Sequence, residues 1–149
     1  MANVSNYYID SKAKSVSSKE SCIVGNKYRI TVLTPRLVRL EYTPSGKFID
    51  APTALVVNRA FKPVPYSITE SDTLLQLDTS IFTITYVKDK NFNATNLGSN
   101  LKAVINNTNI EWQMNSTEAK NLRGINYSID SSKNGIVLDT GLYSLDGYA

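Results

Sequence analysis

Short stretches in which apolar and polar residues alternate are the dominant pattern of this 149-residue sequence. Every second side chain is apolar in residues 27–32, and residues 37–42 repeat the pattern. Successive side chains of a β-strand point to opposite faces, so such alternation is typical of strands with one face on a core and one in water. Thr34-Pro35-Arg36 separates the two stretches, and proline favours a turn because it fixes φ and donates no hydrogen bond. We therefore predict a β-meander in this part of the chain.

Further strand candidates follow at short intervals. They are residues 55–58, 66–70, 74–78, 81–87, 101–105, 110–113 and 135–138. A helical period is sustained nowhere for more than two turns: residues 116–121 favour a single turn, and residues 88–100 a long polar loop rich in asparagine. Short strands separated by Pro, Gly and Asn turns are typical of an antiparallel sandwich. The sequence predicts an all-β, antiparallel β-sandwich.

Length and composition favour one soluble domain. A chain of 149 residues fits a single domain, and 42% apolar with 19% charged residues argues against intrinsic disorder. Residues 1–21 are rich in Ser, Lys and Asn, so we predict a polar leader arm there and the sandwich domain over residues 22–149. The longest aliphatic run, residues 54–57, is too short to span a membrane, and residues 1–20 lack the apolar segment of an export signal. We expect a cytoplasmic protein with no membrane partner.

The absence of histidine and the single cysteine exclude several chemistries within these residues. No Ser-His-Asp or Cys-His nucleophile system and no Cys/His zinc site can form, and Cys22 has no partner for an internal disulfide. Cys22 lies in an apolar stretch, which favours a buried, inert thiol. The net charge of +3 comes from scattered basic residues without the concentrated stripe of a nucleic-acid face. We predict no metal, no cofactor and no nucleic-acid partner.

Four segments, in chain order, carry a resemblance to a known family. They are YRITVLTPRLVRLEY at 28–42, PTALVVNRAF at 52–61, NLRG at 121–124 and GLYSLDGYA at 141–149. The first resembles the opening of the N-terminal domain of glycoside hydrolase family 31, which contains α-glucosidases and α-xylosidases. The others resemble that domain's P-T-x-x-V-x-N-R-x-F stretch, its N-L-x-G step and its G-L-x-S-x-x-G-W/Y-A close.

The resemblance implies a galactose-mutarotase-like supersandwich, which in this family precedes a (β/α)8 barrel carrying the catalytic aspartates. The family nucleophile stands in a W-x-D-M-N/S-E type motif, whereas the only tryptophan here, Trp112, is followed by Gln-Met without that aspartate. No catalytic residue is therefore carried over to this chain. We expect a sandwich cut short at Ala149, whose partners are the catalytic barrel of the same parent chain and, through it, a carbohydrate substrate. A strand edge left uncovered by the cut would favour a homodimer.

The residues themselves agree with a non-catalytic role. Retaining glycosidases need two carboxyl groups about 5–5.5 Å apart, one of them with a raised pKa. The 13 acidic residues of this chain are spread singly, and no spacing pairs them. The leading hypothesis is a non-catalytic N-terminal domain of an α-glucosidase-like enzyme that supports the barrel and shapes the rim of its substrate pocket. The alternative is a stand-alone carbohydrate-binding sandwich; an adhesin-like interaction domain is a third reading, by analogy of fold alone.

Two residues in the second motif are the candidate site. Asn58 and Arg59 follow an apolar run, and the planar five-donor guanidinium of Arg59 suits a barrel interface or the rim of a substrate pocket. The alternative is a strand-end arginine satisfied by backbone carbonyls or by a local carboxylate. Arg39 and Glu41 suggest a surface cross-strand ion pair. Trp112 is either a platform for a sugar ring or, with Ile110 on the same strand face, part of the core.

Overall fold

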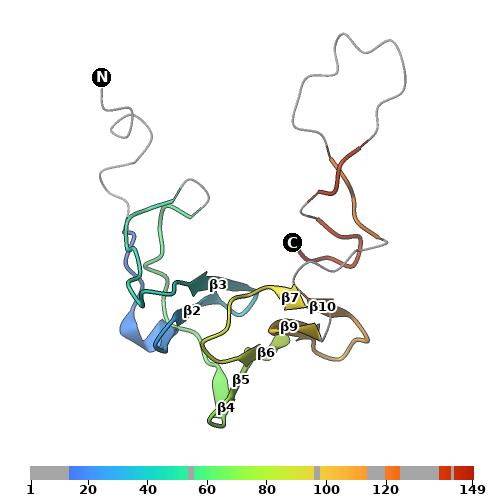
Figure 1. The fold of residues 1–149 in the computed structure, drawn as a ribbon. Helices are drawn as coiled ribbons and strands as arrows, with labels where there is room; N and C mark the ends of the chain where they lie inside the picture. The colour runs from blue at the N-terminus through green and yellow to red at the C-terminus, as the bar shows by residue number, and fades with distance from the viewer. Residues whose placement is uncertain (1–13, 54–55, 96–97, 114–119, 125–137, 142) are drawn as a thin grey trace. The chain divides into compact units, whose positions relative to one another are not determined.

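The computed structural model describes residues 14–53, 56–95, 98–113, 120–124, 138–141 and 143–149. The chain forms two compact units, Met1–Met114 and Asn115–Ala149, each taken here by itself. Among the described residues the only helix is a single 3-10 turn, η2 (Lys19–Ser21), and the regular structure is otherwise β (Figure 1). No helix within these ranges is both long and apolar enough to cross a membrane.

The described residues of the first unit form three antiparallel sheets. The smaller of the two main sheets has the order β1-β2-β3, with β1 (Cys22–Val24), β2 (Tyr28–Thr34) and β3 (Leu37–Tyr42). The larger has the order β10-β9-β6-β5-β4, with β4 (Ser67–Glu70), β5 (Leu74–Asp78), β6 (Phe82–Val87), β9 (Leu101–Ile105) and β10 (Glu111–Gln113). A separate ribbon pairs β7 (Ala94–Thr95) with β8 (Gly98–Ser99).

One apolar core is shared by the two main sheets, which confirms the prediction of an all-β sandwich. Strand β2 contributes alternate residues because these share one face of a strand. The buried residues of this core are Tyr28, Ile30, Val32, Leu75, Leu77, Ile84, Tyr86 and Leu101. Burial of each aliphatic or aromatic side chain contributes about 1.5–3 kcal/mol. Trp112 is partly buried and packs against the same cluster, which places it with the core.

Aromatic side chains close one region of the core. The centroid of the Tyr86 ring lies 5.0 Å from that of Tyr28 and 5.4 Å from that of Phe92, and both pairs of rings pack edge to face. The Tyr86 hydroxyl donates to the carbonyl oxygen of Lys90 at 2.5 Å, so its one polar group is satisfied inside the core. Burial raises the pKa of Tyr86 well above its ordinary range. This tyrosine therefore fixes the chain after β6 against the sandwich.

Most of the predicted strands are confirmed within one or two residues, but two predictions are wrong. Residues 56–58 form no strand, because the carbonyl and amide of Val56 are taken up by a local turn with Thr53. The segment 88–100, predicted as a polar loop, contains the β7-β8 ribbon. The predicted strand at 135–138 and the helical turn at 116–121 lie almost wholly outside the described residues.

In the second unit the third and fourth motif segments are hydrogen-bonded to each other. The side-chain amide of Asn121 donates to the carbonyl of Gly141 and accepts from its N–H, both at 2.8 Å, in the way a neighbouring strand would. The Leu122 amide donates to Tyr143 O at 2.8 Å. A Cβ on Gly141 would lie 2.7 Å from a backbone oxygen of Arg123, so the close approach requires glycine.

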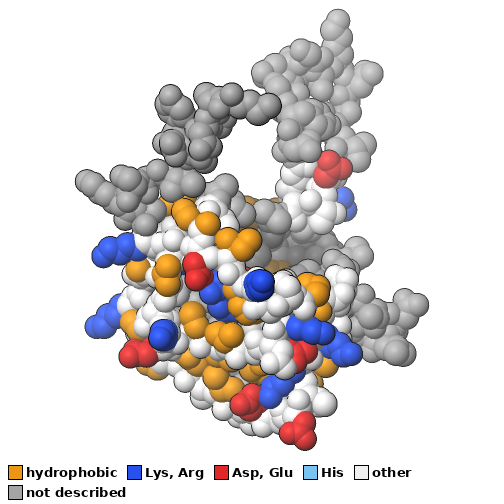
Figure 2. All heavy atoms as spheres, turned by 60° about the vertical axis from the view of Figure 1, so that its left-hand side comes forward, with side chains coloured by type: hydrophobic (Ala, Val, Ile, Leu, Met, Phe, Trp, Pro, Cys, Tyr) orange, Lys and Arg blue, Asp and Glu red, His pale blue; other side chains and the backbone are white. Residues whose placement is uncertain are grey.

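The surface of the molecule carries single apolar side chains among charged ones. On the face turned forward in Figure 2, apolar side chains lie between lysines, arginines and acidic residues. The most exposed large apolar residues of the first unit are Ile49, Val24 and Val16, at 72%, 61% and 60% of their full exposure. Scattered apolar residues of this kind are normal on a folded protein.

Candidate functional site

The outer face of the small sheet carries a cluster of charged side chains. The inward positions of β2 belong to the core, so Arg29 and Thr31 occupy the opposite face. The register pairs Arg29 with Glu41 and Thr31 with Arg39, which brings these four residues of β2 and β3 side by side. Alternation along two antiparallel strands thus assembles polar groups that are up to 12 positions apart in the sequence.

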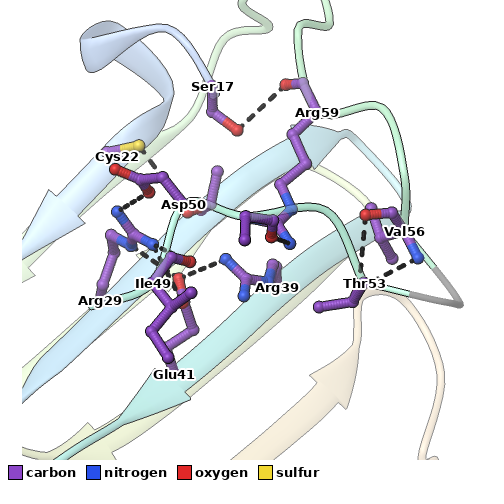
Figure 3. A network of polar contacts seen from close by, with 12 residues as sticks. Ser17, Cys22, Arg29, Arg39, Glu41, Ile49, Asp50, Thr53, Val56 and Arg59 are labelled. Carbon is purple, nitrogen blue, oxygen red and sulfur yellow. Dashed lines mark hydrogen bonds and ion pairs between the residues drawn. The ribbon is translucent and has the colours of Figure 1, made fainter. Parts of the chain in front are cut away.

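Glu41 binds two arginines at once (Figure 3). Its carboxylate accepts from Arg29 Nε at 2.6 Å and Nη2 at 3.0 Å, and lies 2.7 Å from Arg39 Nη1. Arg29 Nη1 also donates to Asp50 at 2.7 Å. The hydrogen bond with Glu41 and, less strongly, that with Asp50 raise the pKa of Arg29, against the opposing effect of its burial. The predicted pair of Arg39 and Glu41 is present, but along one strand; the cross-strand partner of Glu41 is Arg29.

Arg59 is buried beside this cluster, with only 2% of its surface exposed. Its backbone amide donates to Lys14 O at 2.7 Å, and its carbonyl accepts from the Ser17 hydroxyl at 3.0 Å. Its Nη2 donates to Ala51 O at 2.8 Å. Its Nε and Nη1 have no hydrogen-bond partner among the described residues. Burial, and next the positive charge of Arg39, lower the pKa of Arg59.

A small cavity of about 30 Å³ lies at this point of the first unit. It is lined by all three arginines, by Asp50 and by small side chains of the N-terminal segment and of β1 and β2: Ser15, Val16, Ser17, Cys22 and Thr31. A water molecule needs roughly 10–15 Å³ measured in this way, so the cavity has room for about two waters or for one very small solute. Among its charged groups, the arginines outnumber the carboxylates.

The two predicted site residues behave differently. Arg59 lines the cavity and is satisfied only in part by a backbone carbonyl, without a directly bonded carboxylate among the described residues. Asn58 is exposed, and its side-chain oxygen accepts from the Ala60 amide at 3.1 Å. The sequence analysis did not single out Arg29 or Asp50. The signal for Arg29 was its outward position in β2 opposite Glu41, which becomes visible only once the register of the hairpin is known.

Several described carboxylates have structural partners in this fold. Asp78, at the β5-β6 turn, accepts from the Ser80 amide at 2.8 Å and from the Thr83 hydroxyl at 2.7 Å. Glu70 and Glu111 form ion pairs with lysines. Within the ranges given above, no group of three or more Cys, Asp or Glu side chains could hold a metal ion. Neither a known protein-family model nor a curated protein sequence matches the chain.

Proposed function

We propose that this chain is the non-catalytic N-terminal β-sandwich of a family 31 glycoside hydrolase, in the group of α-glucosidases and α-xylosidases. The observation that carries the proposal is the ordered set of four motif segments at 28–42, 52–61, 121–124 and 141–149. The all-β sandwich is compatible with the galactose-mutarotase-like domain of this family. The hydrogen bonds between the third and fourth segments explain in structural terms why these motifs contain an asparagine and a glycine.

In this role the sandwich supports a (β/α)8 barrel that carries the catalytic acids and binds the carbohydrate. The described acids fit a supporting part: Glu41 and Asp50 hold arginines, and Asp78 holds a turn. Arg59 is the residue proposed to lie at the barrel interface or the pocket rim; exposed Asn58 would be its neighbour there. We place the protein in the cytoplasm, a reducing compartment with which the free thiol of Cys22 is compatible.

The coding sequence downstream of residue 149 provides the direct test. The proposal predicts alternating strands and helices there, with a W-x-D-M-N/S-E type motif on a barrel strand. A stop codon at this point, or a different fold encoded downstream, would overturn it.

A biochemical test uses the purified 149-residue chain. It is expected to release no nitrophenol from nitrophenyl α-glucoside or α-xyloside, and calorimetric titrations with maltose and xylose oligomers are expected to be flat. Turnover would refute the non-catalytic role. Saturable binding of the oligomers would favour a stand-alone carbohydrate-binding module instead.

Self-association through β4 is a further part of the proposal. This strand is one of the two outer strands of the larger sheet, its four residues are exposed, and Ile68 retains 41% of its exposure. An uncovered strand edge offers backbone donors and acceptors to a second copy. Light scattering is expected to show a dimer that Ile68→Lys dissociates; a wild-type monomer at high concentration would contradict this.

A further inference from the structure

Residues 14–17, which we call the strap, pack over the charged cluster on the outer face of the small sheet. Ser15, Val16 and Ser17 line the cavity of about 30 Å³ together with all three arginines of the cluster. Figure 3 shows Ser17 beside Arg59, with its hydroxyl turned toward the Arg59 carbonyl. The strap therefore forms part of the wall that separates this cavity from solvent.

Two hydrogen bonds to the backbone of Arg59 hold the strap in place. The Lys14 carbonyl accepts from the Arg59 amide at 2.7 Å, and the Ser17 hydroxyl donates to the Arg59 carbonyl at 3.0 Å. The one apolar residue of the strap, Val16, keeps 60% of its exposure and is not among the described residues of the core. Burial of apolar surface is the main force that fixes a segment to a fold, so the strap is attached more weakly than the strands.

The chain that follows the strap is firmly fixed to the sandwich. Ser21 is buried, the Tyr66 hydroxyl donates to the Glu20 carbonyl at 2.8 Å, and β1 pairs with β2. Ser18 joins the two parts: its backbone is extended, with φ −57° and ψ 142°, and η2 begins at the next residue. A change in the dihedral angles of Ser18 is therefore enough to lift the strap without disturbing a strand.

The closed strap leaves the guanidinium of Arg59 in an unfavourable environment. Its Nη2 donates to Ala51 O, but Nε and Nη1 are buried without a partner among the described residues. A buried donor without a hydrogen bond is destabilising, and more so when the group is charged. An open strap would admit water to the cavity and through it to this guanidinium. Hydration would then offset the two hydrogen bonds that opening breaks.

We infer that the strap opens about Ser18 while the rest of the sandwich stays folded, and that the buried, partly unpaired guanidinium of Arg59 drives this opening. In the closed form Arg59 is only 2% exposed, so another molecule cannot reach it. The strap thus controls access to Arg59 and to the cavity beside it. This device belongs to the chain itself and does not depend on whether a glycosidase barrel follows.

Amide hydrogen exchange of the complete chain tests the inference. The Arg59 amide donates to the strap at Lys14, whereas the Thr79 amide donates to Phe82 O at 3.1 Å in the β5-β6 turn. Both residues are buried, at 2% and 1% of their full exposure. The Arg59 amide is expected to exchange at least about tenfold faster, at a rate that low urea concentrations leave unchanged, because a local opening exposes little surface. Equal rates with the same dependence on urea would overturn the inference.

Two substitutions are expected to move the strap in opposite directions. Ser17→Ala removes a hydrogen bond of the closed form, so the amide of residue 59 exchanges faster. Arg59→Met keeps a long unbranched side chain without the unpaired donors, so the same amide exchanges more slowly even though the bond to Ala51 is lost. Ser45→Ala is the matched control, because the Ser45 hydroxyl accepts from the Lys47 amide in an exposed turn. Faster exchange in Arg59→Met would refute the role of the guanidinium.

Trypsin supplies an independent measurement on the same four proteins. The Lys14 carbonyl is held by the Arg59 amide, so cleavage after Lys14 requires an open strap. Mass spectrometry is expected to show this cut forming faster in Ser17→Ala and more slowly in Arg59→Met than in the wild type and Ser45→Ala. Equal cleavage rates in all four proteins would contradict the inference.

Discussion

Replacement of Glu41 by glutamine removes the charge that holds two arginines on the outer face of the small sheet. The wild-type carboxylate makes contacts of 2.6, 3.0 and 2.7 Å with Arg29 and Arg39. After the substitution, the arginines of the cluster face the carboxylate of Asp50 alone, and the excess charge rises from +1 to +2. We expect a lower free energy of unfolding.

The size of the loss follows from the burial of the three side chains. They keep only 13–18% of their exposure, so the pairs resemble buried rather than surface ion pairs. Removal of one partner from a fully buried pair costs about 3–5 kcal/mol, whereas an exposed pair contributes about 0–1 kcal/mol. The residual exposure places Glu41→Gln at about 2–4 kcal/mol. That is a large part of the roughly 5–15 kcal/mol that stabilises a domain.

Urea unfolding followed by circular dichroism measures this loss. Glu111→Gln is the matched control, because its ion pair with Lys102 spans 3.5 Å and the two side chains keep 50% and 42% of their exposure. The control is expected to lose no more than about 0.5 kcal/mol.

The reasoning is refuted if Glu41→Gln and Glu111→Gln lose the same free energy. The two variants would then show that the cluster contributes no more than a surface pair.

Three further changes test the fold. Tyr86→Phe deprives the Lys90 carbonyl of its donor at 2.5 Å and is expected to lower the free energy of unfolding by about 1–2 kcal/mol in urea. The hydrogen bond from the Ser80 amide holds the pKa of Asp78 below its ordinary value. The ionised carboxylate therefore stabilises the fold at pH values above its pKa in the unfolded chain, and this contribution is lost as the pH falls through its pKa in the folded protein. Asp78→Asn is therefore expected to be less stable than wild type at pH 7, and thermal melts should show the difference closing below about pH 4; a constant gap would contradict the linkage. Gly46→Ala forces a side chain onto φ +68° and places its Cβ 2.5 Å from a backbone oxygen, so thermal melts should show a loss of at least about 1–2 kcal/mol; an unaffected melting temperature would argue against this turn.

Local chemistry explains which predictions from sequence were confirmed. Strands β2, β3 and β5 lie where apolar residues alternate, because the side-chain period of a strand is a property of consecutive residues. The predicted strand at residues 56–58 was wrong although its apolar composition favours a strand. No neighbouring strand pairs with these residues, and Thr53 forms hydrogen bonds with the backbone groups of Val56. The membership of family 31 stays a prediction.

The sequence by itself determined that the chain is all-β, that Tyr28, Ile30 and Val32 face the core, and that Arg59 was a candidate site residue. Only the tertiary structure decided that Arg59 is buried with unused donors, and that Arg29, Arg39 and Glu41 share one face beside it. The alternation of apolar and polar side chains is a property of consecutive residues. Burial and charge balance depend instead on strand register and on segments such as 14–17 and 49–51 that pack over the sheet. Those contacts join residues up to 45 positions apart, and their free energy comes from the assembled fold, not from any stretch of sequence read alone.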